Sequence, residues 1–243
     1  MTSKNNNFYT NKVVYKPWGY EYVIYSDENR LAITFVKIDY GHKTSLHCHP
    51  QKKTGFIILG GKASVQIGIY KENTNNFKSL SRLVFRPGLF HSIKAESKEG
   101  IYALEFETPY KKNDLLRFKD NYGRKKKDYE GKKFTKSLNS DFIKFQKPKL
   151  NQKFQYDFNN LKIVIEKRKN LKNFPKKDDN STTAVLDGCI IDSRGQNVIS
   201  IGEIVKSSTL KILSENFKIK DELTILRVFK KKGNFKKNNK LVS

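Results

Sequence analysis

Short runs of β-branched and aromatic residues, separated by turn residues, fill the first half of the chain and restrict the folds open to it. These runs are residues 21–26, 31–40, 55–70, 81–88 and 100–107. Valine, isoleucine, phenylalanine and tyrosine favour strands, and no stretch here keeps a helical period. Short strands at regular spacing are typical of sandwiches and barrels. The sequence therefore predicts an all-β fold for the first half.

Composition changes after this region. Residues 110–136 are polar and heavily charged, which favours a surface segment or linker. Strand-like runs then return at 161–168, 183–192, 196–205 and 223–229, with turn residues between them. We predict three parts: a β-domain over residues 1–125, a basic polar linker over 126–160 and a second, smaller β-rich domain over 161–243.

The net charge and the number of cysteines indicate which partners the protein can bind and in which cellular compartment it lies. The net charge is +25, but lysine is spread along the whole chain and no nucleic-acid motif appears, so we expect no specific nucleic acid. No apolar run approaches the 18 or so residues of a membrane span, and no signal-peptide pattern is present. Cys48 and Cys189 do not make a disulfide framework. We expect a reduced, cytoplasmic protein that does not enter a membrane.

Two of the four histidines lie one residue apart. Residues i and i+2 of a strand share a face, so His47 and His49 project together while Cys48 points away. A third imidazole would come from His91, while His42 is interpreted as an ordinary surface or packed residue. Three imidazoles on adjacent strands suit Zn, Fe, Ni, Cu or Mn. We therefore predict one divalent metal ion (Zn, Mn or Fe) held by His47, His49 and His91.

The segments around these histidines resemble the two sequence motifs of cupins, and the resemblance covers residues 16–109. The matching residues are Gly41, His47, His49 and Gly61 in the first motif, and Pro87, Gly88 and His91 in the second. The resemblance implies a double-stranded β-helix, a small jelly-roll barrel with a metal in its mouth.

The sequence departs from the cupin pattern at two positions. Thr54 stands where the first motif has its glutamate ligand, and Ala95 stands at the second motif's terminal asparagine. The predicted site is therefore three histidines with open positions. Glu105 and Glu107 share one face of a predicted strand and are our candidates for a catalytic base.

The segments on either side of the two motifs indicate which group of cupins the chain resembles. Residues 16–21 and 113–124 resemble the cupin of type II phosphomannose isomerases and related cupins of sugar-nucleotide pathways. This implies a sugar phosphate or nucleotide sugar as the small-molecule ligand, in surface polysaccharide synthesis. Arginine binds phosphate bidentately. The candidate substrate-binding residues are Arg117, Arg124, Lys53 and Arg86.

Three functions stay open from the sequence. The first is a metal-dependent isomerase-like enzyme acting on a phosphorylated sugar. The second is a three-histidine non-haem iron dioxygenase, which the threonine at position 54 favours. The third is a non-catalytic cupin that binds a sugar or effector. The second half, which contains no histidine, is either a degenerate cupin, making a bicupin, or a β-extension for dimerisation. We expect a homodimer.

Overall fold

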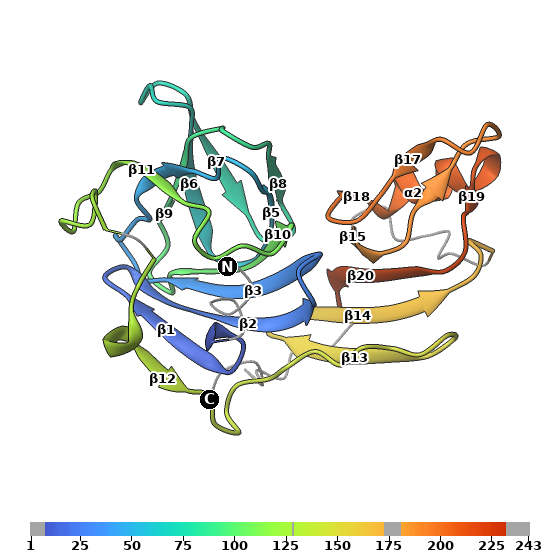
Figure 1. Ribbon diagram of the computed structural model, residues 1–243, viewed down its shortest axis with the longest axis horizontal. Coiled ribbons are helices and arrows are strands. Elements are labelled where there is room, and N and C mark those ends of the chain that lie inside the picture. The colour runs from blue at the N-terminus through green and yellow to red at the C-terminus, as the bar shows by residue number, and fades with distance from the viewer. Residues whose placement is uncertain (1–7, 128, 173–180, 232–243) are drawn as a thin grey trace. The chain divides into compact units, whose positions relative to one another are not determined.

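The computed structural model describes residues 8–127, 129–172 and 181–231 (Figure 1). The chain divides into two compact units, Met1–Ser140 and Asp141–Ser243. Strands predominate in both units, as the sequence predicts. No helix in the described ranges is both long and apolar enough to cross a membrane.

The first unit is built from two antiparallel sheets. The seven-stranded sheet has the order β12 (Thr135–Ser137), β1 (Lys12–Lys16), β2 (Gly19–Asp27), β3 (Leu31–Ile38), β10 (Ile101–Thr108), β5 (Lys53–Gly60) and β8 (Arg82–Phe85). The five-stranded sheet has the order β11 (Leu116–Lys119), β4 (Leu46–Cys48), β9 (His91–Ala95), β6 (Lys62–Ile67) and β7 (Thr74–Lys78). Strands distant in sequence are neighbours in both sheets, for example β3 and β10 or β4 and β9. This is the jelly-roll winding of the double-stranded β-helix, the cupin fold.

A hydrophobic core is shared by strands of both sheets. Phe56 and Phe85 come from the seven-stranded sheet, Val65 and Ile93 from the five-stranded sheet, and Trp18 from the β1–β2 turn. Alternate residues of each strand point into this core. The core thereby fixes which face of each strand can contribute side chains to the barrel interior.

Gly61, the last glycine of the first cupin motif, is required by close backbone contact. It has φ +82°, a left-handed conformation that favours glycine, and a Cβ there would lie 2.0 Å from the carbonyl oxygen of Gly100. The glycine lets the chain turn between β5 and β6. The sequence run 55–70 is therefore two strands of different sheets.

The boundary between the units lies inside the stretch predicted to be a linker, residues 126–160. The 3₁₀ helix η1 (Lys132–Phe134) and strand β12 belong to the first unit, and β12 pairs with β1. The structure thus assigns residues up to 140 to the first unit, and the three predicted parts stay a prediction. Strand β12 is three residues long and mostly exposed, so it carries no apolar alternation that a sequence pattern could detect.

Over residues 141–172 and 181–231 the second unit also contains two antiparallel sheets, together with the helix α2 (Ser207–Asn216). The larger sheet has the order β13 (Lys153–Phe158), β14 (Leu161–Arg168), β20 (Leu223–Lys230), β15 (Thr182–Asp187) and β18 (Ile204–Lys206). The smaller sheet has the order β17 (Asn197–Ile199), β16 (Ile190–Ile191) and β19 (Lys218–Ile219). Leu210 of α2 is fully buried in a core with Val185 and Ile225. That this unit is a degenerate cupin stays a prediction.

Candidate metal centre

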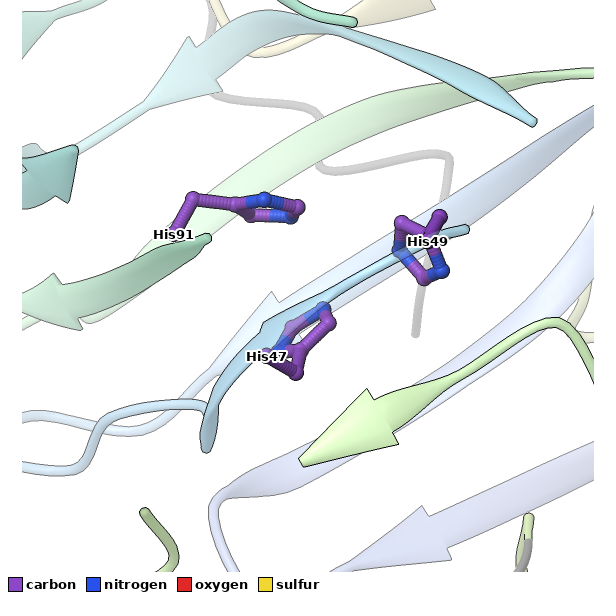
Figure 2. A group of neighbouring side chains, drawn as sticks. All are labelled: His47, His49 and His91. Atoms are coloured by element: carbon purple, nitrogen blue, oxygen red, sulfur yellow. The ribbon is translucent and has the colours of Figure 1, made fainter. Parts of the chain in front are cut away.

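Strand pairing brings the three predicted histidines together. His47 of β4 lies opposite His91 of β9, and His49 follows directly after β4. The ring centroids are 4.5 Å apart for His47 and His91, 5.0 Å for His47 and His49, and 5.5 Å for His49 and His91. One ring nitrogen from each of the three lies within 4.8 Å of the others. Figure 2 shows the rings facing a common space.

Each imidazole is oriented by its Nδ1 atom. The Nδ1 atoms lie 2.8 Å from the carbonyl oxygen of Ser45 for His47, 2.6 Å from that of Asp114 for His49, and 3.0 Å from that of Leu89 for His91. A ring that donates its Nδ1–H to a carbonyl leaves the Nε2 lone pair as its acceptor. Among the described residues, the buried Nε2 atoms of His49 and His91 have no hydrogen-bond partner.

Burial keeps these rings neutral. Loss of hydration lowers the pKa of His47 and of His49 well below the usual value, and it lowers the pKa of His91 to about 4. A histidine can bind a divalent metal only when its imidazole is neutral and a nitrogen lone pair is free. The residues present therefore fit a three-histidine metal site.

Two neighbours hold the ligand set in place. The Phe85 ring stacks on the His91 ring at 4.1 Å and 6°. The Asp114 carboxylate accepts the backbone N–H of Lys52 at 2.8 Å and that of Gln51 at 3.0 Å, while the Asp114 carbonyl contacts His49. Asp114 thus links the segment that precedes β11 to the loop that follows His49. Its role was not predicted, although it belongs to the segment that resembles the sugar-pathway cupins.

A buried carboxylate with two lysine partners lies in the same cavity as the histidines. Glu107 is 1% exposed, and its oxygens lie 2.6 Å from Lys52 Nζ and 2.7 Å from Lys112 Nζ. Thr34 donates its hydroxyl to the same carboxylate at 2.9 Å. Burial alone would raise the pKa of Glu107, but Lys112 and Lys52 hold it below the usual range. Glu107 is therefore ionised at neutral pH.

Glu105, two residues earlier on β10, is in the opposite state. Burial, followed by the charge of Glu107, raises the pKa of Glu105 to about 8, while Lys112 opposes the rise. It also lines the cavity that contains the three histidines. The structure thus places the face of Glu105 and Glu107 toward the barrel interior. Two carboxyl groups with pKa values driven apart are the arrangement used for acid–base work.

The four predicted substrate-binding residues separate into two pairs. Arg117 and Arg124 line the cavity, whereas Lys53 and Arg86 are not among its lining residues. Arg124 forms a bidentate pair with the carboxylate of Asp120 and contacts Glu130 at 2.6 Å. Arg117 donates to the carbonyl oxygen of Lys127 and lies 3.7 Å from Glu130, so both arginines are partnered inside the protein.

Sequence reasoning missed several polar and charged residues of the cavity. They are Lys16, Glu21, Lys112, Tyr129 and Glu130. Tyr129 donates its hydroxyl to Glu21, and Lys16 pairs with Glu130. Lys16 and Glu21 bound the segment 16–21 that resembles the sugar-pathway cupins, which is the signal that could have found them. Tyr129 and Glu130 lie in the highly charged stretch after residue 124, where no pattern distinguishes them.

No protein-family model matches the sequence, and no curated protein is significantly similar to it. Solved structures do match part of the chain. The Schizosaccharomyces pombe Cnp3 cupin domain is 20% identical, with 37% of this chain and 64% of that chain covered and a TM-score of 0.35. A candidate sugar phosphate isomerase from Acidithiobacillus ferrooxidans is 20% identical, with coverages of 33% and 51% and a TM-score of 0.30.

The capsular polysaccharide assembling protein CapF from Staphylococcus aureus is a third match. It is 13% identical, 44% of this chain and 34% of that chain are covered, and the TM-score is 0.39. The chain spans less than two thirds of the length of each of these three structures, at 64%, 51% and 34%. At these identities the likeness is one of fold.

Proposed function

We propose that this protein is a metal-dependent cupin that acts on a phosphorylated sugar or a nucleotide sugar, in the manner of an isomerase. The observation that carries the proposal is the state of the three histidines. Their Nδ1 atoms are held by backbone carbonyls, and the buried Nε2 atoms of His49 and His91 are without partners in the described chain. His47, His49 and His91 would hold one divalent ion.

The charge of the cavity supports an anionic ligand. Five basic side chains and four acidic side chains line it: Lys16, Lys52, Lys112, Arg117 and Arg124 against Glu21, Glu105, Glu107 and Glu130. A proton on Glu105 leaves three negative charges against five positive ones, and the Asp120 carboxylate, which is bidentate to Arg124, offsets one of the five. A divalent ion on three neutral imidazoles adds two further positive charges. A phosphate or a nucleotide diphosphate would offset this excess.

The chemistry proposed is the shift of a proton between two adjacent carbons of an aldose or ketose. A bound metal would supply Lewis-acid polarisation of the carbonyl and its neighbouring hydroxyl. Glu105 would act as the base, and its side chain lines the same cavity. Its ionised form, a minor fraction near neutral pH because its pKa is about 8, would take the proton from one carbon and return it to the adjacent carbon. Glu107 stays ionised between its two lysines and fixes them in the wall. No oxidant is consumed in such a step.

Solvent exchange tests the proposal directly. Metal-loaded protein is incubated in D₂O with a panel of sugar phosphates, nucleotide sugars and the corresponding neutral sugars, and deuterium incorporation is followed by NMR. We expect deuterium at a carbon next to the carbonyl of at least one phosphorylated sugar, and none with Glu105→Gln or with His47→Ala/His49→Ala.

Oxygen uptake and thermal stability, measured on the same protein and ligands, separate the alternative functions. Oxygen uptake with Fe(II), without deuterium exchange, would support the three-histidine dioxygenase and contradict the proposal. Stabilisation by a sugar without exchange or oxygen uptake would instead support a binding protein.

A further inference from the structure

Three basic side chains converge on one buried carboxylate, that of Glu130. Arg124 Nη1 lies 2.6 Å from Glu130 Oε1, Arg117 Nη2 lies 3.7 Å from it, and Lys16 Nζ pairs with Glu130 Oε2. The four side chains are between 4% and 9% exposed. Burial alone would raise the pKa of Glu130, but Lys16 and Arg124 keep it below the usual value, so this carboxylate is charged.

This cluster lies beside the metal ligands. Arg117 on β11 is the direct cross-strand partner of His47 on β4. Side chains opposite each other in an antiparallel pair lie on the same face within about 5 Å at Cβ. Lys16, Arg117, Arg124 and Glu130 also line the same cavity as the three histidines. A ligand whose carbonyl end lies at the histidines could therefore place an anionic group at this cluster.

The segment that supplies the carboxylate is attached mainly by polar groups. Among its described residues, 125–127 and 129–134, only Glu130 is buried. Tyr9 donates its hydroxyl to the Glu130 carbonyl at 3.0 Å, and Tyr129 donates to Glu21. The ring of Tyr129 contacts Tyr9 at 4.9 Å and Lys16 at 3.8 Å. No aliphatic side chain anchors the segment, because residues 125–134 contain none.

We propose that Glu130 occupies the phosphate subsite of the cavity and that the phosphate group of a ligand displaces it. Lys16, Arg117 and Arg124 then pair with a phosphate dianion in place of the Glu130 carboxylate. Segment 125–134 becomes more mobile because it loses these contacts. A dianion gains more than a monoanion from three converging charges, and Arg124 and Arg117 offer it charge-assisted hydrogen bonds. The inference rests on the proposed function for the identity of the ligand, but the displacement itself needs only a phosphate.

A tethered carboxylate competes with a free ligand at an effective concentration on the order of millimolar. Its removal should therefore strengthen phosphate binding. Trp18, the chain's single tryptophan, lines the cavity and is 5.9 Å from Lys16 Nζ, so its fluorescence can report binding. The probe is inorganic phosphate, titrated into the full-length chain and its variants.

We expect Glu130→Gln to bind phosphate at least about tenfold more tightly than the wild type, since the internal competitor is gone. The matched control is Glu166→Gln, which removes a carboxylate paired with Arg168 and Arg227 in the second unit and should bind phosphate as the wild type does. Adding Arg117→Gln to Glu130→Gln should abolish the gain. Equal or weaker binding by folded Glu130→Gln would overturn the proposal.

A second measurement needs no variant. Trypsin cleavage of the wild type after Lys125, Lys126, Lys127, Lys132 and Lys133 is mapped by mass spectrometry with and without phosphate, with cleavage elsewhere in the chain as the reference. Displacement predicts faster cleavage in phosphate at these sites alone. Unchanged or slower cleavage there would contradict it.

The metal-ligand variant His47→Ala/His49→Ala separates this inference from the proposed function. If the gain from Glu130→Gln persists in that background while no sugar phosphate exchanges deuterium in metal-loaded wild type, the anion subsite stands and the isomerase proposal falls. If the gain is lost in that background, phosphate binds at the metal and the subsite proposal is wrong.

Discussion

Thr54 and Glu107 face each other in register across strands β5 and β10. Both side chains therefore lie on the cavity side of the sheet, because directly opposed residues share a face and Glu107 lines the cavity. Thr54 is fully buried, and its hydroxyl has no hydrogen-bond partner in the described chain. The position that carries a carboxylate ligand in the cupin motif is thus directed inward but supplies no charge.

This relationship predicts a gain of metal binding on Thr54→Glu. A fourth, anionic ligand should tighten divalent-metal binding at least about tenfold, measured by competition with a chelator. In EDTA the same variant should be less stable by about 3 kcal/mol, because a buried carboxylate then lies unpaired beside Glu107. Thr54→Gln, which has a similar size and no charge, should show neither effect to this degree. Equal metal affinity in the two variants would refute the assignment.

The second prediction concerns metal content. Wild type should contain one divalent ion per chain, and His47→Ala/His49→Ala should contain none, by elemental analysis of protein purified without a histidine tag. His42→Ala is the matched control, because His42 is exposed and lies outside the cluster. The metal should also raise the melting temperature of the wild type and of the control, since it binds the native state. Retention of metal by the double variant would disprove the site.

The third prediction is a pH dependence of stability caused by Glu105. Its pKa is raised to about 8 in the folded protein, from 4.5 in the unfolded chain, chiefly by burial. Between these values the folded state holds a proton that the unfolded state releases, so the free energy of unfolding falls as pH rises from about 4.5 to 8. Glu105→Gln removes this penalty.

Urea unfolding in EDTA at pH 5, 7 and 9 measures the effect. The stability of Glu105→Gln relative to wild type should increase steadily with pH across this series. Glu96→Gln, which removes an exposed carboxylate, is the control for loss of a carboxylate from the protein surface. A flat difference for Glu105→Gln would mean that Glu105 is ionised in the folded protein.

The site was predictable where chemistry coincides with a local pattern. The His47–His49 spacing and the proline-glycine turn before His91 point to one site, and the alternation of Glu105 and Glu107 placed both on one face. Strand periodicity also predicted β2, β3 and β10 closely, because these strands carry continuous or alternating apolar residues.

No such sequence pattern marks the charged residues that line the cavity, which we call the charged wall. Lys16 and Glu130 are 114 residues apart, and their contact depends on how β1 and the segment after β11 are placed by the fold. In a chain with 49 lysine and arginine residues, one buried lysine cannot be told from a solvated one by sequence. For the same reason no sequence pattern singles out Lys16 and Lys112 among the basic residues.

The last prediction concerns Lys112, whose burial makes it a stringent test of the charged wall. Its Nζ lies 2.7 Å from Glu107 and 3.5 Å from Glu21, and the lysine side chain is 3% exposed. Lys112→Met keeps the apolar stem but leaves two buried carboxylates with one cation fewer, which should lower the free energy of unfolding by about 3–5 kcal/mol.

The control is Lys94→Met, which removes the partner of Glu96 in an exposed pair, with side chains 44% and 39% exposed. It should lower the free energy of unfolding by less than about 1 kcal/mol. Urea denaturation at pH 7 measures both. Adding Glu107→Gln to Lys112→Met should restore part of the loss, since it removes the unpaired charge. If Lys112→Met and Lys94→Met are equally stable, water reaches this wall and the carboxylates are not buried as the structure places them.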